Sequence, residues 1–285
     1  NGPYNHMKIY KKGSTAFIDR DSQFYECPIN DWDQLINRDN LYGYLVDLVD
    51  SLEPVQLDAG TLDVTDPPME NQEIWAAGVT YLKSKTARME EAKQAGGDQF
   101  YDKVYDALRP ELFFKATKYR TSGHGGQVRI RNDSHWDVPE PELTLFVNSQ
   151  GSIQGYSVGN DMSSRSIEGE NPLYLPQAKV YDHCASLGPC LYVPETTIAP
   201  TAQINLSIYR EEQLMYQDSV GIDRMKRTHS ELVAYLFLEC SFPYGVFLMT
   251  GTCLVPPNQF TLQKGDIVNI SIEHIGTLSN VVDKK

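Results

Sequence analysis

From Leu112 onward, the chain is dominated by short runs of β-branched and aromatic residues that are separated by turn residues. Such runs predict strands, because these side chains pack well on a pleated surface. The predicted strands cover 112–116, 142–148, 153–159, 202–210, 214–220, 246–250, 266–273 and 277–282. One helix, at 232–239, interrupts them after a capping box formed by Thr228 and Glu231. We therefore expect this part of the chain to be mostly β.

The first 70 residues predict a small N-terminal α/β domain. Strand patterns at 7–10 and 15–18 precede a helical pattern at 31–52, in which leucines recur at helical spacing and Asn30 is the expected N-cap. The polar, Pro-broken stretch 66–72 is typical of a linker and sets the boundary between domains 1–70 and 71–285. Residues 1–6, before Met7, resemble the remnant of a tag. A strand at 74–81 and helices at 82–93 and 99–108 open the larger domain.

The charge balance limits the partners of this chain. Its 25 Lys and Arg residues against 38 Asp and Glu residues give a net charge of −13, which disfavours binding to nucleic acid or to anionic membranes. Apolar runs long enough to span a membrane and a basic, apolar leader are both missing from the sequence. The five scattered cysteines indicate neither a disulfide framework nor a zinc site. These features predict a soluble, cytoplasmic protein.

Glu140 and Glu142 are the most informative pair, because side chains two residues apart on a strand project to one face. If Asn148 faces Ile153 across a hairpin, Glu140 lies opposite Asp161 and Glu142 lies opposite Gly159. Three carboxylates then converge, with Leu143, Leu145 and Val147 directed toward a core on the other face.

Such a carboxylate cluster repels itself unless a cation lies among its members, and oxygen ligands of this kind suit magnesium, manganese or calcium. The alternative is that Glu140 and Glu142 lie on the solvated face of an edge strand, which Pro139 and Pro141 would mark. Lys179 is either a surface lysine or a group that polarises a substrate oxygen or acts as a base beside the metal.

Several ordered motifs together resemble the fumarylacetoacetate hydrolase superfamily over roughly the last three quarters of the chain. They are the residues at 77–81, 140–143, 159–165, Lys179, 187–189, 250–252, 264–266 and 276–278. The resemblance implies an α+β, mostly β fold, a mixed β-sandwich roll preceded by the small N-terminal domain. It also implies magnesium at Glu140, Glu142 and Asp161, with manganese or calcium as substitutes.

The resemblance further implies roles for individual residues. Lys179 and Glu111 would be catalytic, and Tyr81, Ser84, Arg165 and Thr252 would contact the substrate. Glu168 occupies a position where the family often has a polar residue that contacts substrate. On the residues alone, Glu111 is equally a surface carboxylate after Pro110, Thr252 an ordinary strand residue and Arg165 a structural ion-pair partner.

The sequence differs from the family pattern at one position, and this difference indicates which branch of the family it resembles. Members that hydrolyse carbon–carbon bonds usually carry a histidine where this chain has Ser84, and a serine cannot take a proton from water near neutral pH. The segment 110–115 resembles instead the branch that dehydrates 2-keto-3-deoxy sugar acids such as 2-keto-3-deoxy-arabinonate.

We therefore predict a magnesium-dependent dehydratase that converts a 2-keto-3-deoxy-pentonate to 2,5-dioxopentanoate. The resemblance also implies a homodimer or homotetramer. The alternatives are an acylpyruvate hydrolase or oxaloacetate decarboxylase on the same metal site, and a non-catalytic metal-binding assembly protein.

Overall fold

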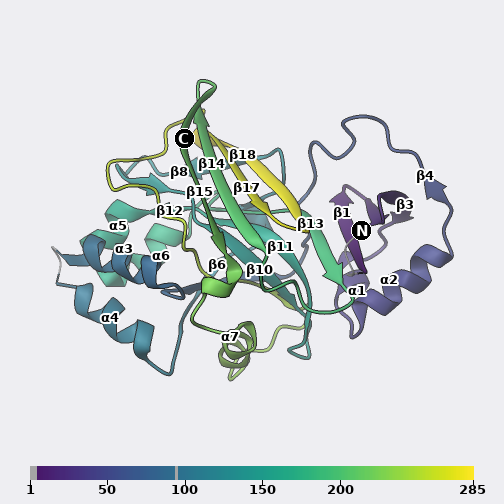
Figure 1. The fold of residues 1–285 in the computed structure, drawn as a ribbon, viewed down its shortest axis with the longest axis horizontal. Helices are drawn as coiled ribbons and strands as arrows, with labels where there is room; N and C mark the ends of the chain where they lie inside the picture. Colours follow the sequence, from purple (N-terminus) through teal and green to yellow (C-terminus); the bar gives the residue numbers. More distant parts are fainter. Residues whose placement is uncertain (1–4, 94–95) are drawn as a thin grey trace.

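The computed structural model describes residues 5–93 and 96–285, and its centre is a large mixed β-sheet (Figure 1). The strand order is β4-β3-β2-β1-β13-β11-β10-β16-β5-β6, with β7 paired to β13. These strands are β1 (His6–Lys12), β2 (Thr15–Arg20), β3 (Gln23–Pro28), β4 (Pro54–Val55), β5 (Glu73–Gly78), β6 (Glu111–Ala116), β7 (Thr121–Ser122), β10 (Pro141–Val147), β11 (Ile153–Asp161), β13 (Ala185–Pro194) and β16 (Val246–Met249).

A five-stranded sheet packs on one face of the large sheet and forms a sandwich with it. Its order is β15-β14-β17-β18-β8, with β8 (Gln127–Ile130), β14 (Gln203–Arg210), β15 (Gln213–Gly221), β17 (Ile267–Ile272) and β18 (Gly276–Lys284). Leu143, Leu145 and Val147 enter the shared core, as their alternation predicts, and meet residues such as Leu206 and Ile270. The short strands β9 (Asp137–Val138) and β12 (Ser163–Ser164) form a separate pair.

The other face of the large sheet is covered by the N-terminal helices. Helices α1 (Trp32–Ile36) and α2 (Leu41–Asp50) bury Ile36, Leu41 and Leu45 in a second core that also contains Phe146 and Phe247. Strands β10 and β13 are consequently buried on both faces. Because β1 pairs with β13, the N-terminal strands extend the same sheet that carries the later strands.

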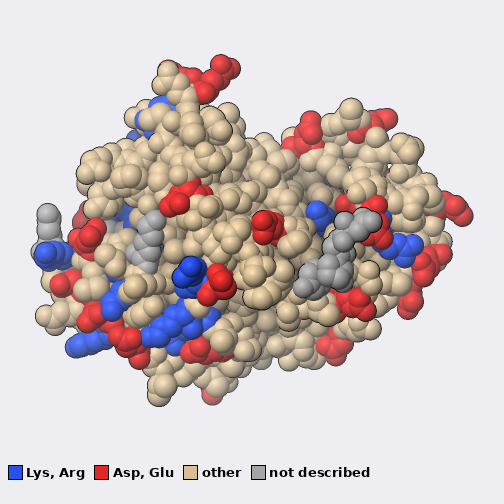
Figure 2. All heavy atoms as spheres, in the orientation of Figure 1, with Lys and Arg blue, Asp and Glu red and all other residues tan. Residues whose placement is uncertain are grey.

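The remaining helices lie mainly at the opposite end of the molecule from α1 and α2 (Figure 1). They are α3 (Leu82–Ala92), α4 (Asp98–Asp106), α5 (Arg165–Glu170), α6 (Leu175–Lys179) and α7 (His229–Leu236), with 3₁₀ turns η2 (Lys118–Arg120), η3 (Pro172–Tyr174) and η4 (Ile222–Arg224). Thr228 caps α7 by accepting a hydrogen bond from the amide of Glu231, as its capping box predicts. Within 5–93 and 96–285, none of the helices has the length and apolarity needed to cross a membrane. Figure 2 shows acidic side chains distributed over the visible face.

Two local predictions are wrong, and one long strand was not predicted. The helix expected at 31–52 is two helices, because Asn40 adopts a left-handed conformation and its side chain caps α2 at the amide of Gly43. The cap of α1 is Asp31 rather than Asn30. Strand β13 is missing from the sequence prediction because Gly188 and Pro189 have turn chemistry; the structure accommodates them at an irregularity in the pairing with β11.

Candidate active site

The hairpin of β10 and β11 brings three acidic side chains together. Glu142 pairs with Gly159, and the amide of Asp161 donates to the carbonyl of Glu140 at 2.9 Å, as the predicted register requires. One carboxylate oxygen from each of Glu140, Glu142 and Asp161 lies within 4.8 Å of the other two. The predicted register holds from Pro141 to Phe146, beyond which a bulge pairs Val147, rather than Asn148, with Ile153.

The alternative of a solvated edge strand is wrong. Strand β10 lies between β11 and β16, and Glu140, Glu142 and Asp161 are at most 5% exposed. Gly159, which pairs with Glu142, makes room for Thr144, because a side chain there would collide with the Thr144 hydroxyl.

Two buried lysines neutralise part of this charge. Lys179 Nζ lies 2.8 Å from Glu140 and 3.1 Å from Asp161, so Lys179 is not a surface residue. Lys115, which the sequence analysis missed, lies 2.6 Å from Asp161 and also donates to the carbonyls of Met162 and Lys179. The available signal in the sequence was a lysine directly after the apolar residues of the predicted strand at 112–116. A lysine that is buried in such a strand needs an acidic partner.

The lysines leave the cluster electrostatically unbalanced. Burial raises the pKa of Glu142 well above its usual range, and the charges of Asp161 and Glu140 raise it further. Burial also raises the pKa of Glu140 to about 7, although Lys179 opposes this. Burial alone would raise the pKa of Asp161, but Lys115 and Lys179 outweigh it and keep that pKa below its usual value. Three hard oxygen donors with excess negative charge fit a divalent cation of the magnesium or calcium kind.

Glu111, Arg88 and Glu168 form a second group around the carboxylate cluster. An Arg88 nitrogen lies 3.5 Å from Glu111, and Arg88 Nε lies 3.4 Å from Glu168, which in turn lies 3.3 Å from Lys179. Gly78 makes room for the Glu111 carboxylate, because a side chain at Gly78 would collide with it. Glu111 and Glu168 were identified from the sequence, whereas Arg88 was not, because α3 carries it into the site from a different part of the chain.

The other predicted site residues occupy distinct positions. Arg165 is buried and donates to Glu140 at 3.2 Å. Thr252 lines the same small cavity as Glu140 and Asp161, and its hydroxyl has no hydrogen-bond partner among the described residues. Ser84 also lines this cavity, but its hydroxyl donates to the carbonyl of Tyr81 at 2.7 Å and accepts from the amide of Tyr81 at 3.3 Å, and the second contact caps α3. Tyr81 is buried at the start of that helix and is not among the residues that line the cavity.

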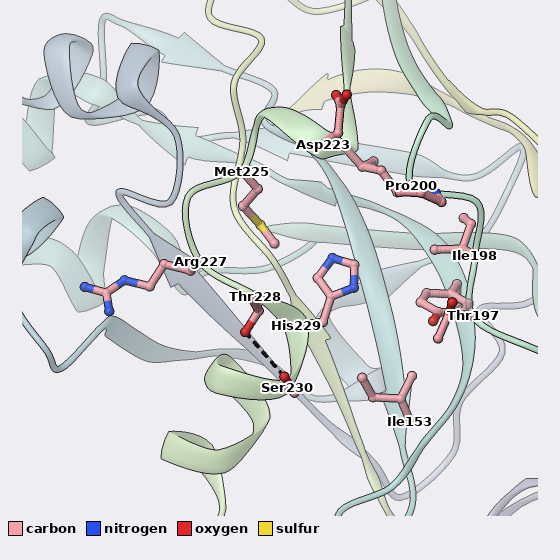
Figure 3. A pocket seen from close by; sticks show the side chains of 12 residues that line it. Ile153, Thr197, Ile198, Pro200, Asp223, Met225, Arg227, Thr228, His229 and Ser230 are labelled. Atoms are coloured by element: carbon pink, nitrogen blue, oxygen red, sulfur yellow. Dashed lines mark hydrogen bonds between the residues drawn. The ribbon is translucent and has the colours of Figure 1, made fainter.

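A larger hollow of about 420 Å³ lies elsewhere and is shown in Figure 3. Apolar residues such as Ile153, Ile198 and Met225 line it beside His229. It contains none of the predicted site residues, most of which line the smaller, acidic cavity instead.

The model of the fumarylacetoacetate hydrolase C-terminal family matches residues 73–283, which include every acidic and basic group described above. The chain belongs to this family. The matched region contains β5 through β17 and all but the last residue of β18, which agrees with the mostly β fold that the motifs imply.

Two curated relatives are similar to this chain over about three quarters of its length and of their own. A probable 2-keto-3-deoxyxylonate dehydratase from Haloferax volcanii is 52% identical over 216 residues, 75% of this chain and 73% of the relative. A 2-dehydro-3-deoxy-D-arabinonate dehydratase from Saccharolobus solfataricus is 41% identical over 220 residues, 76% of this chain and 74% of the relative.

A solved structure extends the similarity to the whole chain. It is that of a 2-keto-3-deoxy-D-arabinonate dehydratase complexed with magnesium and 2,5-dioxopentanoate. The two chains share 33% identity, superpose with a TM-score of 0.82 and cover 99% of each other. The similarity therefore includes the N-terminal strands and helices that precede the family match.

We predict that Mg²⁺ raises the Tm of the protein by a larger amount at higher pH. A carboxyl group whose pKa is raised on folding, such as Glu140 from 4.5 to about 7, stabilises the metal-free fold below pH 4.5 and loses that contribution as the pH rises to about 7. Ionised carboxylates are also the form that binds the cation. The difference in Tm between samples with Mg²⁺ and with EDTA should therefore increase from pH 5 to pH 8. A difference that stays constant or shrinks over this range would contradict the prediction.

Proposed function

We propose that this chain is a magnesium-dependent dehydratase that converts a 2-keto-3-deoxy-pentonate to 2,5-dioxopentanoate. The observation that carries the proposal is the buried triad of Glu140, Glu142 and Asp161 beside Lys179, in a chain that is 52% and 41% identical to two dehydratases of such acids. Xylonate and arabinonate differ at carbons 2 and 3, whose stereocentres the 2-keto-3-deoxy acids no longer have. A 2-keto-3-deoxy-pentonate is therefore the substrate class common to both relatives.

The charges of the site support an anionic substrate together with a divalent cation. The ionisable groups are the carboxylates of Glu111, Glu140, Glu142, Asp161 and Glu168 and the cations of Arg88, Lys115, Arg165 and Lys179. Four positive and five negative charges give −1, and a divalent cation brings the sum to +1. The single negative charge of a 2-keto acid's carboxylate then brings the sum to zero. A buried site favours such a balance, because an uncompensated buried charge is destabilising.

A bound magnesium ion would supply Lewis acidity that makes the hydrogens on carbon 3 of a 2-keto acid easier to remove. Glu140, Glu142 and Asp161 would hold the ion, and Lys115 and Arg165 keep two of these carboxylates in position. Burial lowers the pKa of Lys179, but Asp161, Glu140 and Glu168 outweigh it and hold the pKa above its usual value. Lys179 therefore acts as an ammonium group that stabilises the developing enolate oxygen, rather than as a base.

Glu111 is the group we assign to proton transfer. Its Oε2 is buried without a hydrogen-bond partner among the described residues, so it can take a proton from carbon 3 and return it to the hydroxyl that leaves carbon 4 as water. The product of this step has a double bond between carbons 3 and 4. A proton shift from carbon 5 to carbon 3 gives an enol, and its ketonisation at carbon 4 gives the aldehyde of 2,5-dioxopentanoate.

The cavity at the site is about 20 Å³, which accommodates roughly one water molecule. The side chains around it must move apart to admit a five-carbon acid.

The test is to incubate the protein with Mg²⁺ and 2-keto-3-deoxy-arabinonate and to follow the products by NMR. We expect 2,5-dioxopentanoate, which an aldehyde dehydrogenase oxidises, and we expect EDTA to abolish its formation. Pyruvate with glycolaldehyde would indicate an aldolase. Pyruvate from an acylpyruvate would indicate the hydrolase, CO₂ from oxaloacetate the decarboxylase, and Mg²⁺ binding without turnover the assembly protein.

We further propose that the enzyme is a homodimer or homotetramer in the cytoplasm. Light scattering after size-exclusion chromatography tests the assembly, and fractionation of the source cells tests the location.

A further inference from the structure

The guanidinium of Arg88 is held on three sides. It contacts Glu111 and Glu168 at 3.5 and 3.4 Å, and Cζ lies 5.0 Å from the centre of the Tyr101 ring. Helices α3 and α4 supply Arg88 and Tyr101, while Glu111 begins β6 and Glu168 belongs to α5. Three elements besides its own helix thus hold a side chain that is only 5% exposed.

One nitrogen of the Arg88 guanidinium takes no part in these contacts. Arg88 Nη1 is buried and has no hydrogen-bond partner among the described residues. Glu111 Oε2 and Thr252 Oγ1 are also buried without a hydrogen-bond partner among the described residues. Arg88 and Thr252 both line the acidic cavity. Burying such groups unpaired costs stability, so their number in one place indicates a ligand that pairs with them.

The unpaired atoms differ in chemistry, and the difference describes the ligand. Arg88 Nη1 can only donate, Glu111 Oε2 accepts when ionised, and Thr252 Oγ1 can do either. Adjacent hydroxyl groups, each of which donates and accepts, complement this set. In a 2-keto-3-deoxy-pentonate, the carbons that carry hydroxyls are 4 and 5.

We propose that Arg88 determines specificity by donating a hydrogen bond from Nη1 to the hydroxyl on carbon 5. The inference rests on the proposed function, in which Glu111 acts at carbons 3 and 4. Arg88 contacts Glu111 through Nη2. Because Nη1 belongs to the same guanidinium, a substrate whose carbons 3 and 4 lie at Glu111 would bring carbon 5 toward Nη1. The site therefore selects acids that carry a hydroxyl at carbon 5 over 5-deoxy acids.

The test compares two substrates, 2-keto-3-deoxy-arabinonate and its 5-deoxy analogue, 4-hydroxy-2-oxopentanoate. Both can lose water across carbons 3 and 4, and NMR measures this initial loss for each. A hydrogen bond from a charged donor contributes roughly 10- to 100-fold to kcat/KM, so wild type should prefer the pentonate by about that factor. Arg88→Met and Arg88→Lys should reduce kcat/KM for the pentonate roughly 10- to 100-fold more than for the analogue. Lys85→Met, on the same helix, should leave the preference unchanged.

The outcomes separate this inference from the proposed function. If wild type dehydrates neither acid, the proposed function fails and this inference fails with it. If wild type dehydrates the pentonate but the Arg88 variants lose the same factor on both acids, Arg88 is only structural and the inference is overturned. Equal turnover of both acids by wild type overturns it as well. Mg²⁺ titrations and thermal denaturation of each variant distinguish a lost contact from a lost fold.

Discussion

Replacing Glu142 with glutamine is expected to change activity and stability in opposite directions. We expect kcat/KM to fall by about 10³-fold or more, because a metal's Lewis acidity contributes several kcal/mol to such a reaction. In EDTA, the same variant should have a higher Tm than wild type near pH 8. Burial and the charges of Asp161 and Glu140 raise the pKa of Glu142, so its ionised form destabilises the metal-free protein.

Glu142 is the informative ligand because it makes no ion pair with a lysine among the described residues. Glu142 accepts a hydrogen bond from the amide of Gly251 at 2.8 Å, and the side-chain oxygen of a glutamine can accept the same hydrogen bond. Exposed Glu170 on α5 provides the control, and Glu170→Gln should match wild type in both assays. Glu142→Gln with undiminished activity, or with lower metal-free stability, would refute the assigned role.

Glu111→Gln is expected to reduce kcat roughly 10²- to 10⁴-fold, the usual contribution of a positioned general acid or base. The amide keeps the shape of the side chain beside Gly78 but transfers no proton. Affinity for Mg²⁺ should change little, because Glu111 is not in the carboxylate cluster. Single-turnover kinetics with Mg²⁺ in excess measure the effect on the chemical step.

Glu239→Gln, at an exposed position after α7, is the matched control and should behave as wild type. A decrease of less than about tenfold in the Glu111→Gln variant would exclude Glu111 as the main proton carrier, since a positioned acid or base contributes far more. A parallel loss of Mg²⁺ affinity would show instead that Glu111 supports the metal site.

The carboxylate cluster was predictable because its three members lie on a single hairpin. Once Glu142 faces Gly159, the pleat and the pairing place Glu140 beside Asp161 without further information. The bulge near Val147 escaped prediction, but it lies at the far end of the hairpin and does not change the cluster.

The groups around the ligands could not be predicted in the same way. Lys115 reaches Asp161 from β6, at the edge of the sheet, and Arg88 reaches Glu168 from a helix, so both contacts depend on tertiary packing. No local pattern in the sequence relates such distant positions. The same reason applies to β1 and β13, whose pairing joins the N-terminal segment to the large sheet.

Isothermal titration of the metal-free protein with Mg²⁺ asks directly whether the three buried carboxylates bind a cation. We expect one Mg²⁺ per chain, binding that strengthens from pH 6 to pH 8, and loss of that binding in Glu142→Gln but not in Glu170→Gln. Absence of Mg²⁺ binding by wild type, or equal binding by Glu142→Gln, would show that these buried carboxylates do not form a metal site.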